Sequence, residues 1–347
     1  MAKVLHITEC HYGGVSKAIR KLLELVPNHD HYLLYSGEDQ GYSSAMVKAV
    51  EFHSHGMLGR AREVRKAVES VQPDYLHLHS SWAGVYGRLT PLNANVIYQP
   101  HCYKFDDPTL GLSKKWAFRL AEKLLTIRSD ATVVLSPHEE RLSRALRAQL
   151  DCYYVPNAPS CEVRSFAVGK SDGERRPRTV IMVGRICKQK DPDFFRQVAT
   201  LAVTRPLLSD WTFRWIGDGE LEHRASLESA GIQISGWKDE KELVGELDRA
   251  DYYVHSATYE GFPISILDAA ARGLPIIARE ISALEGSAAY QVRTPLDVVN
   301  ALEQSASNFE FYTKLLSRSR QLLELMNEVN QKKAWNSVYS SSPGSVA

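Results

Sequence analysis

The chain has 347 residues, 44% of them hydrophobic and 24% charged, a composition that excludes wholesale disorder. This length exceeds that of a typical single core, so we expect two domains of about 150 residues each. The sequence holds 42 lysines and arginines against 41 aspartates and glutamates. Such a balance gives no global electrostatic reason to bind nucleic acid, and we expect no nucleic-acid partner.

The cysteine pattern and the chain start indicate a cytoplasmic protein. The five cysteines lie far apart and form no C-x-x-C pair, so we expect reduced thiols rather than a disulfide framework or a zinc site. The first residues, MAKVLHITECHYGG, are too rarely apolar for a signal peptide. No apolar run approaches the ~20 residues of a membrane span.

In the first half of the chain, short apolar runs alternate with stretches of helical period. The periodicity predicts helices over residues 13–26, 57–71 and 114–128. The apolar runs are rich in β-branched residues and tyrosine, which favour strands. We expect strands at residues 3–7, 31–36, 74–79, 95–99, 131–136 and 152–156.

A boundary is expected near residues 157–178, which are rich in Ser, Gly, Pro and charge and read as a linker or surface excursion. The same alternation resumes after this segment, and residues 308–341 read as helix throughout. We expect further strands at residues 178–184, 212–217, 232–236, 251–256 and 274–278.

This alternation predicts an α/β fold of two facing Rossmann-like domains, each with a parallel sheet covered by helices, and an interdomain cleft. We place the domains at residues 1–160 and 161–325, followed by a terminal helix at 326–347. In open α/β sheets ligands bind beyond the carboxyl ends of the strands. The loops that follow the predicted strands are therefore the places to look for a site.

The loop after the strand at 178–184 carries two cations. The strand is predicted to end at Gly184, and Arg185 and Lys190 follow five residues apart. Two cations so placed suit a phosphate or a carboxylate. Solvated surface charges are the alternative, which these residues alone leave open.

Residues 191–193 read Asp-Pro-Asp, which resembles a D-x-D metal-binding pair. In this context Asp191 fits an N-cap, Pro192 the first helical position and Asp193 the first turn. We therefore interpret the segment as an ordinary helix start and expect no metal site.

Two glycine-rich stretches resemble a dinucleotide fingerprint but lack its third glycine. One is WIGDGE, with Gly217 after a predicted strand, and the other is HYGGVSKA, with Gly13 and Gly14. NAD is therefore not expected as a cofactor. Gly13 and Gly14 still allow backbone N–H groups to approach an anion or substrate closely, with a simple tight turn as the alternative.

The segment EGFPISILDAAARGLPIIA begins at Glu260 and places a second acid, Asp268, eight positions later. A loop should end at Pro263, after which a helix begins, so its exposed N–H groups and positive dipole lie beside Glu260. Asp268 then lies only about 7 Å along the helix axis from Pro263. The two acids can grip different hydroxyl-bearing parts of one ligand, or Glu260 can cap the helix while Asp268 is solvated.

Taken together and in order, these pieces resemble the retaining glycosyltransferases of family 4, which have the GT-B fold. The resemblance covers nearly the whole chain. VGRICKQK resembles the family's Gly-Arg-x4-Lys phosphate motif and EGFPISILD its E-x7-E segment, both specific motifs. GGVSKA resembles the N-domain glycine loop and VPNAP the crossover motif. HSSWAGVYGR resembles a variant found among enzymes of bacterial surface polysaccharides.

The resemblance implies catalytic roles for four residues. Arg185 and Lys190 would neutralise the donor diphosphate, Glu260 would contact the transferred sugar, and His101 would lie near that sugar. Cys102 stands where the family more often has glycine. Asp268 would hold the ribose hydroxyls, although the family usually has Glu there. The remaining donor-binding residues would be Gly13, Gly14, Gly184, Gly217, Gly261, Phe262, Pro263 and Ile264.

The function implied is metal-independent, retaining hexosyl transfer from a nucleotide sugar, with UDP expected, to a glycan or lipid-linked acceptor in cell-surface polysaccharide biosynthesis. No cofactor is expected. The first domain would bind the acceptor and the second the donor, and the terminal helix would cross back to the first domain. A GT-B nucleotide-sugar epimerase and a non-catalytic scaffold are the alternatives.

A peripheral membrane contact is a further expectation. Residues 114–128 combine aromatic and leucine side chains with the basic residues Lys114, Lys115, Arg119, Lys123 and Arg128. A basic amphipathic helix of this kind can lie on the anionic inner face of the cytoplasmic membrane. An ordinary surface helix is the alternative.

Overall fold

A computed structural model of the chain describes residues 1–9, 13–37, 46–89, 91–164 and 178–340. The chain divides into two compact units. The first unit comprises Met1–Asn157, Glu260–Phe262 and Glu328–Ala347, and the second comprises Ala158–Tyr259 and Pro263–Asn327. Most of the predicted linker, at residues 165–177, lies outside the described residues.

The first unit contains a seven-stranded parallel sheet with the order β3-β2-β1-β4-β5-β6-β7. The central strands are almost wholly buried, because helices cover both faces of the sheet. The strands are β1 (Lys3–Thr8), β2 (Asp30–Tyr35), β3 (Lys48–Glu51), β4 (Tyr75–His79), β5 (Asn95–Gln99), β6 (Ala131–Val134) and β7 (Asp151–Tyr154).

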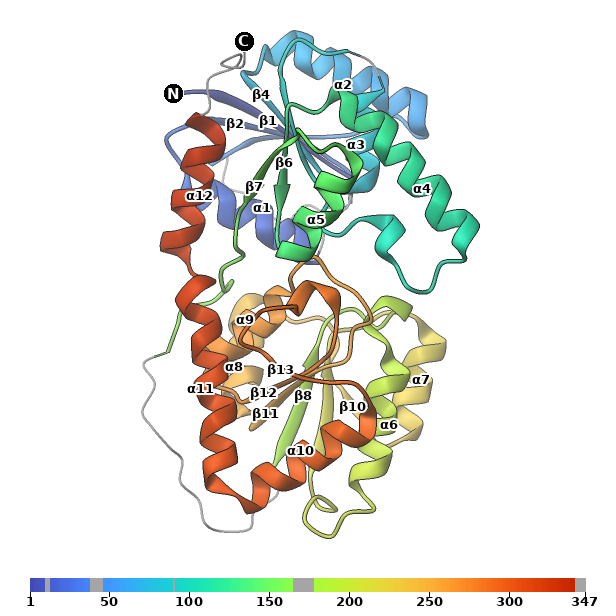
Figure 1. Cartoon of the computed structure of the whole chain (residues 1–347), viewed down its shortest axis with the longest axis vertical. Coiled ribbons are helices and arrows are strands. Elements are labelled where there is room, and N and C mark those ends of the chain that lie inside the picture. Colours follow the sequence, from blue (N-terminus) through green and yellow to red (C-terminus); the bar gives the residue numbers. More distant parts are fainter. Residues whose placement is uncertain (10–12, 38–45, 90, 165–177, 341–347) are drawn as a thin grey trace. The chain divides into compact units, whose positions relative to one another are not determined.

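Two apolar cores flank this sheet. One contains Leu22 of α1 together with Trp335 and Tyr339 of α12, and the other contains Val64 of α2 and Tyr86 of α3. The helices of this unit are α1 (Gly13–Leu25), α2 (Met57–Val71), α3 (Ser81–Arg88), α4 (Leu112–Leu125), α5 (Pro137–Leu146) and α12 (Glu328–Ser340), with short 3-10 turns at Lys104–Asp106 and Thr126–Arg128 (Figure 1).

The second unit contains a six-stranded parallel sheet with the order β10-β9-β8-β11-β12-β13. Its strands are β8 (Thr179–Val183), β9 (Thr212–Ile216), β10 (Gln233–Ile234), β11 (Tyr252–His255), β12 (Ile276–Arg279) and β13 (Tyr290–Val292). Its helices are α6 (Pro192–Ala202), α7 (Leu221–Ser229), α8 (Glu240–Arg249), α9 (Ile264–Ala271), α10 (Pro295–Ser307) and α11 (Phe309–Leu325), with 3-10 turns at Lys188–Lys190 and Ser282–Leu284. The α/β class and the parallel sheets expected from the sequence are confirmed.

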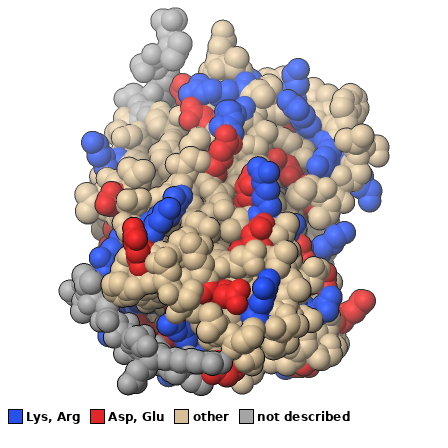
Figure 2. Space-filling view, turned by 60° about the horizontal axis from the view of Figure 1, so that its bottom comes forward, with Lys and Arg blue, Asp and Glu red and all other residues tan. Residues whose placement is uncertain are grey.

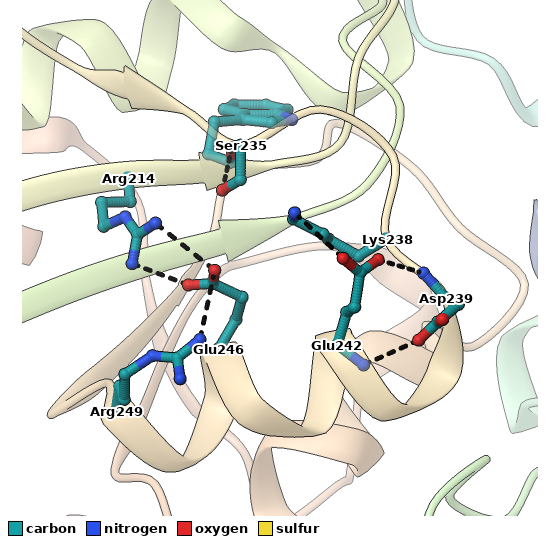
Figure 3. Close-up of polar contacts among 8 residues, drawn as sticks. Arg214, Ser235, Lys238, Asp239, Glu242, Glu246 and Arg249 are labelled. Carbon is teal, nitrogen blue, oxygen red and sulfur yellow. Dashed lines mark hydrogen bonds and ion pairs between the residues drawn. The ribbon is translucent and has the colours of Figure 1, made fainter.

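Polar contacts attach α8 to the sheet of the second unit. The buried Glu246 accepts hydrogen bonds from Arg214 of β9, with Nη1 at 2.6 Å, and lies 3.5 Å from Nη2 of Arg249 (Figure 3). At the start of the helix, Asp239 and Glu242 form a capping box. The helix therefore starts and docks through side chains that serve structure.

The expectation of one continuous helix over residues 308–341 is wrong. The helix stops at Leu325 and a new one starts at Glu328. The Asn327 side chain donates to the carbonyls of Leu323 and Glu324, at 3.1 and 2.9 Å. In a continuous helix these carbonyls would instead accept from backbone N–H groups of the next turn. This break separates α11 of the second unit from α12, which packs in the first unit.

In the second unit, the loop after β8 rests directly on the loop after β9. A Cβ at Gly217 would lie 2.2 Å from the carbonyl oxygen of Gly184, and a Cβ at Gly219 would lie 2.1 Å from that of Ile186. The Trp215 indole donates to the Gly184 carbonyl at 2.7 Å, and Ile186 N–H donates to the Asp218 carbonyl at 2.9 Å. Only glycine permits this backbone contact.

The contact predicts that Gly217→Ala destabilises the second unit by about 3 kcal/mol or more, because the clash adds to the cost of its φ of 136°. Gly231→Ala is the matched control, since Gly231 also has positive φ, at 77°, but its Cβ would meet no described atom within 4 Å. That variant should lose only about 1 kcal/mol. Thermal unfolding of both proteins checks the difference, and equal melting points would contradict the packing.

Candidate functional site

The two predicted cations of the second unit lie on the loop that these glycines support. Arg185 is exposed and Lys190 is partly exposed. A Cβ at Gly184 would lie 3.1 Å from Cε of Lys190, so the lysine side chain passes over this glycine. Gly184, Lys190 and Gly217 therefore come together as one structure at the carboxyl ends of β8 and β9.

This loop is also bonded to the segment that leads to Glu260. The Lys190 carbonyl accepts a hydrogen bond from Ser256 Oγ at 2.6 Å. The Gln189 carbonyl accepts from the Thr258 N–H at 2.9 Å, and the Gln189 side chain donates to the Tyr259 carbonyl at 3.1 Å. The pKa of His255 lies well below its usual value, first because the ring is buried and second because the Lys190 charge is near. The lysine charge thus lies close to the carboxyl end of β11.

The Asp-Pro-Asp segment is the predicted helix start. Asp191 is the N-cap of α6 and accepts from the Phe194 N–H at 3.1 Å. Its other oxygen lies 2.5 Å from Nη1 of Arg279, at the end of β12. Both carboxylate oxygens of Asp191 therefore serve the fold.

Glu260, Gly261 and Phe262 belong to the first unit and pack there against the residues around His101. Glu260 is partly exposed, and Gly261 and Phe262 are buried. A Cβ at Gly261 would lie 2.8 Å from the His101 carbonyl oxygen, so glycine is required there as well. The Phe262 carbonyl accepts a hydrogen bond from the Asn157 side chain at 2.8 Å.

Helix α9 begins directly after this segment. Pro263 is its N-cap and is buried, Ile264 is its first residue and is partly exposed, and no side chain caps the helix start. The first N–H groups of a helix carry partial positive charge, which favours an anion.

Asp268 lies inside the second unit. Its side chain is 2% exposed and accepts two hydrogen bonds from Ser160, one from the backbone N–H at 2.6 Å and one from the hydroxyl at 2.8 Å. Ser160 was not singled out in the sequence, because nothing local to it points to a residue 108 positions away. The ribose-binding role of Asp268 stays a prediction.

The loop after β5 has an unusual backbone. His101 and Cys102 have φ values of 55° and 127°, a region that favours glycine. Strain of this kind costs about 1–3 kcal/mol for a residue with a side chain and persists only where the surroundings hold it. The position at which the family more often has glycine is thus one where the backbone favours glycine.

Glu139, a residue that the sequence analysis missed, lies beside this loop. Its buried carboxylate accepts from the Leu135 N–H at 2.7 Å and is near the Cys102 amide. Burial raises the pKa of Glu139 to about 7, and the two amides oppose that rise. A buried acid in a helical segment gives no signal in the sequence that separates it from a surface acid.

The N-domain glycines lie at the start of α1. Gly13 has a φ of 61°, which glycine adopts without strain, and Gly14 is the second residue of the helix. A Cβ at either glycine would meet no described atom within 4 Å. Residues 10–12, with Cys10 and the first residues of the HYGGVSKA stretch, lie outside the described part of the chain.

Within the described residues, one group has the composition of a metal site. His6, His77 and His79 are buried, and one ring nitrogen from each lies within 4.8 Å of the others. Both ring nitrogens of His6 and of His79 are engaged in hydrogen bonds with other histidines. Nothing in the sequence marked this group, because its members come from two strands.

Charges of both signs are interspersed on the face of the molecule that Figure 2 shows, in line with the balanced composition. Among the helices of the described residues, none is both long enough and apolar enough to cross a membrane.

Comparison with known proteins gives two adjacent family matches. Residues 13–158 match the model described as glycosyl transferase 4-like domain, and residues 177–308 match that of glycosyl transferases group 1. The chain is 25% identical over 302 residues to an uncharacterized 41.2 kDa protein in the cps region of Klebsiella pneumoniae, covering 81% of this chain and 82% of that protein. It is 26% identical over 240 residues to the Escherichia coli UDP-Gal:alpha-D-GlcNAc-diphosphoundecaprenol alpha-1,3-galactosyltransferase, covering 62% and 60%.

Solved structures with the same fold span nearly the whole chain. Sucrose-phosphate synthase from Thermosynechococcus elongatus and Anabaena HepE in complex with UDP and glucose both give a TM-score of 0.80, at 15% and 13% identity. Each comparison covers 99% of this chain and 100% of the other. With the two family matches, these structures confirm the resemblance drawn from the motifs: the chain belongs to the glycosyltransferases of GT-B fold, in family 4.

Proposed function

We propose that this glycosyltransferase moves a hexose from a UDP-sugar to a glycan or lipid-linked acceptor in cell-surface polysaccharide biosynthesis. The proposal rests on one observation: the loop that contains Arg185 and Lys190 is supported by backbone contact with Gly217 and Gly219. The name of the E. coli relative includes a UDP-sugar donor and a diphosphoundecaprenol acceptor. The name of the Klebsiella relative places that protein in a cps region. Both names support this class of donor and acceptor.

The proposed chemistry depends on charge that develops on the departing diphosphate. Arg185 and Lys190 would bind it, and the start of α9 would add the partial charge of its N–H groups. Together these cations and N–H groups would stabilise the diphosphate charge without a metal ion. Glu260 would contact the transferred sugar, and Asp268, oriented by Ser160, would bind the ribose. Because no carboxylate is assigned as a nucleophile, transfer would take place on one face of the sugar and retain its anomeric configuration. The departing diphosphate would accept the proton of the acceptor hydroxyl.

The test is a panel of UDP-, GDP-, ADP- and dTDP-sugars, scored by thermal shift and by release of the nucleotide. We expect one UDP-sugar, at about 100 times its Kd, to stabilise the protein by about 2.7 kcal/mol, or about 5 °C. Glu260→Ala should keep the thermal shift and lose most of the slow hydrolysis. Lys190→Ala should weaken donor binding about 10- to 100-fold, because it removes a charge-assisted contact.

Lys188→Ala is the matched control for Lys190. It removes an exposed lysine from the same 3-10 turn and should leave donor binding unchanged. No shift with any nucleotide sugar would contradict the proposal and favour a scaffold. Epimerised free nucleotide sugar in a one-substrate incubation would identify an epimerase instead. An inverted product anomer, or activity lost to a chelator, would refute retention or metal independence.

We also propose that α4 contacts an anionic membrane surface. Figure 1 shows this helix projecting from the sheet of the first unit, and nearly all its side chains are exposed. Its one acid, Glu122, is buried and accepts from Arg88 and from the Tyr98 hydroxyl, both at 2.9 Å. The exposed surface is therefore basic and apolar. It has the apolar side chains Leu112, Trp116, Phe118, Leu120 and Leu124 beside the exposed Lys114, Arg119 and Lys123 and the partly exposed Lys115.

Co-sedimentation at low salt with anionic and with neutral phosphatidylcholine vesicles tests this contact. Each lysine near an anionic surface contributes about 1 kcal/mol, so the double variant Lys114→Gln/Lys115→Gln should bind roughly 30-fold more weakly. The double variant Arg62→Gln/Lys66→Gln removes two exposed charges from α2 and should bind as wild type does. Failure to bind anionic vesicles, or equal loss in both variants, would contradict the role of α4.

A further inference from the structure

Five histidines lie on one face of the sheet in the first unit. His31 is on β2, His6 on β1, and His77 and His79 on β4, while His101 follows β5. The four strand histidines are at most 5% exposed. They lie on the face that α1 and α12 cover, since His77 contacts Trp335 and Tyr339 of α12. One such residue in a core is ordinary, but four buried ionisable rings on neighbouring strands require partners.

The strand register arranges four of these histidines in a diagonal line. His31 pairs with Val4, His6 pairs with His77, and His79 pairs with Gln99. In the order His31, His6, His79 and His101, each histidine thus lies two residues further toward the C-terminus than the residue paired with the previous histidine. A shift of two residues keeps the side chains on the same face.

Hydrogen bonds join this line from end to end. His101 Nε2 lies 3.1 Å from His79 Nδ1, and His79 Nε2 lies 3.1 Å from His6 Nδ1. His6 Nε2 lies 3.0 Å from His31 Nδ1, and His31 Nε2 lies 2.9 Å from the carbonyl oxygen of Val26. We call His101, His79, His6 and His31 the histidine chain.

The Val26 carbonyl determines the direction of every bond in the chain. A carbonyl only accepts, so His31 carries its proton on Nε2, and a neutral imidazole then has an acceptor at Nδ1. His6 must therefore donate from Nε2, and the same reasoning applies to His79 and to His101. Burial lowers the pKa of His6 and of His31, and lowers that of His101 to about 3, which keeps these rings neutral.

We propose that His79, His6 and His31 are positioning residues that hold His101 as the tautomer protonated on Nε2, so that its Nδ1 accepts a hydrogen bond from a substrate hydroxyl. Among the described residues, Nδ1 of His101 has no hydrogen-bond partner. The inference rests on the proposed function and on the family resemblance, which implies that His101 lies near the transferred sugar. It deepens that function by naming what His101 recognises.

The tautomer restricts the ligand. Nδ1 without a proton accepts from an O–H group and repels a keto or fluoro group, which only accepts. A sugar analogue with fluorine in place of the contacted hydroxyl should therefore bind worse than the parent sugar. Anchoring at Val26, three histidines away, also means that the choice of tautomer does not depend on the loop at 101 and 102.

The main alternative interpretation of these buried histidines is a metal ion bound by His6, His77 and His79. An ion would have to take nitrogens that His6 and His79 use within the chain. His77 stands outside the chain, with Nδ1 2.8 Å from the Tyr339 hydroxyl and its ring stacked on His79 at 4.0 Å. It is therefore a natural control position.

The test is long-range ¹H–¹⁵N NMR of the full-length protein labelled at histidine nitrogen, without any donor. In the wild type we expect His101, His79, His6 and His31 all to carry their proton on Nε2. His31→Phe removes the contact to the carbonyl but keeps a planar ring, so the chain can run in either direction. The tautomers of His101, His79 and His6 should then shift together toward Nδ1–H.

His77→Phe is the matched control, because it replaces a buried histidine on the same face and should leave the tautomer of His101 unchanged. In the donor-hydrolysis assay we expect His31→Phe to lower kcat/KM about two- to tenfold and His77→Phe to leave it unaltered. A proton on Nδ1 of His101 in the wild type, an unchanged tautomer in His31→Phe, or one equivalent of bound metal in the purified protein would each overturn the proposal.

The wild-type spectrum decides the tautomer even if His31→Phe fails to fold. Because the spectrum is recorded without donor, its outcome is independent of whether nucleotide sugars bind. A protein that binds no donor but shows the expected tautomers would refute the proposed function alone. A donor-binding protein with the other tautomer would refute the histidine chain alone.

Discussion

Contact between two glycine-bearing loops determines where the second unit presents its positive charge. The carbonyls of Gly184 and Ile186 occupy the space in which side chains of residues 217 and 219 would otherwise lie. The Trp215 indole and the Asp218 carbonyl complete this backbone contact. Because these contacts fix the backbone from Gly184 to Lys190, that backbone would not need to be ordered when the proposed donor binds, which would lower the entropic cost of binding.

The first unit supports its own loop differently. The backbone at His101 and Cys102 is strained, and buried polar groups lie beside it: Glu139 is near the Cys102 amide, and His79 is hydrogen-bonded to the His101 ring. Gly261 lies directly against the His101 carbonyl. A strained loop surrounded by buried polar groups is an arrangement that suits a preorganised site.

Much of the fold was predictable because central parallel strands are buried on both faces and read as apolar runs. Two strands were missed for the opposite reason: β3, with sequence KAVE, is fully exposed, and β13 has only three residues. The break at Met326 and Asn327 was also missed, since it depends on a side chain that bonds backward to Leu323 and Glu324.

The sequence could suggest a candidate site only where its residues lie close together in sequence. Arg185, Lys190 and Glu260 belong to local motifs. The partnership of Ser160 with Asp268 joins residues 108 positions apart, and the bond between His6 and His79 spans 73. Such pairs depend on strand order and register. The structure also gives Gly217 a packing role that the sequence did not suggest.

The most direct measurement of the central claim is backbone amide hydrogen exchange with and without UDP. We expect slower exchange in residues 184–190 and 260–266, with the effect on 184–190 lost in the double variant Arg185→Ala/Lys190→Ala. Unchanged exchange in both segments at saturating UDP, or the same protection in the double variant, would contradict the assignment of this loop to the donor diphosphate.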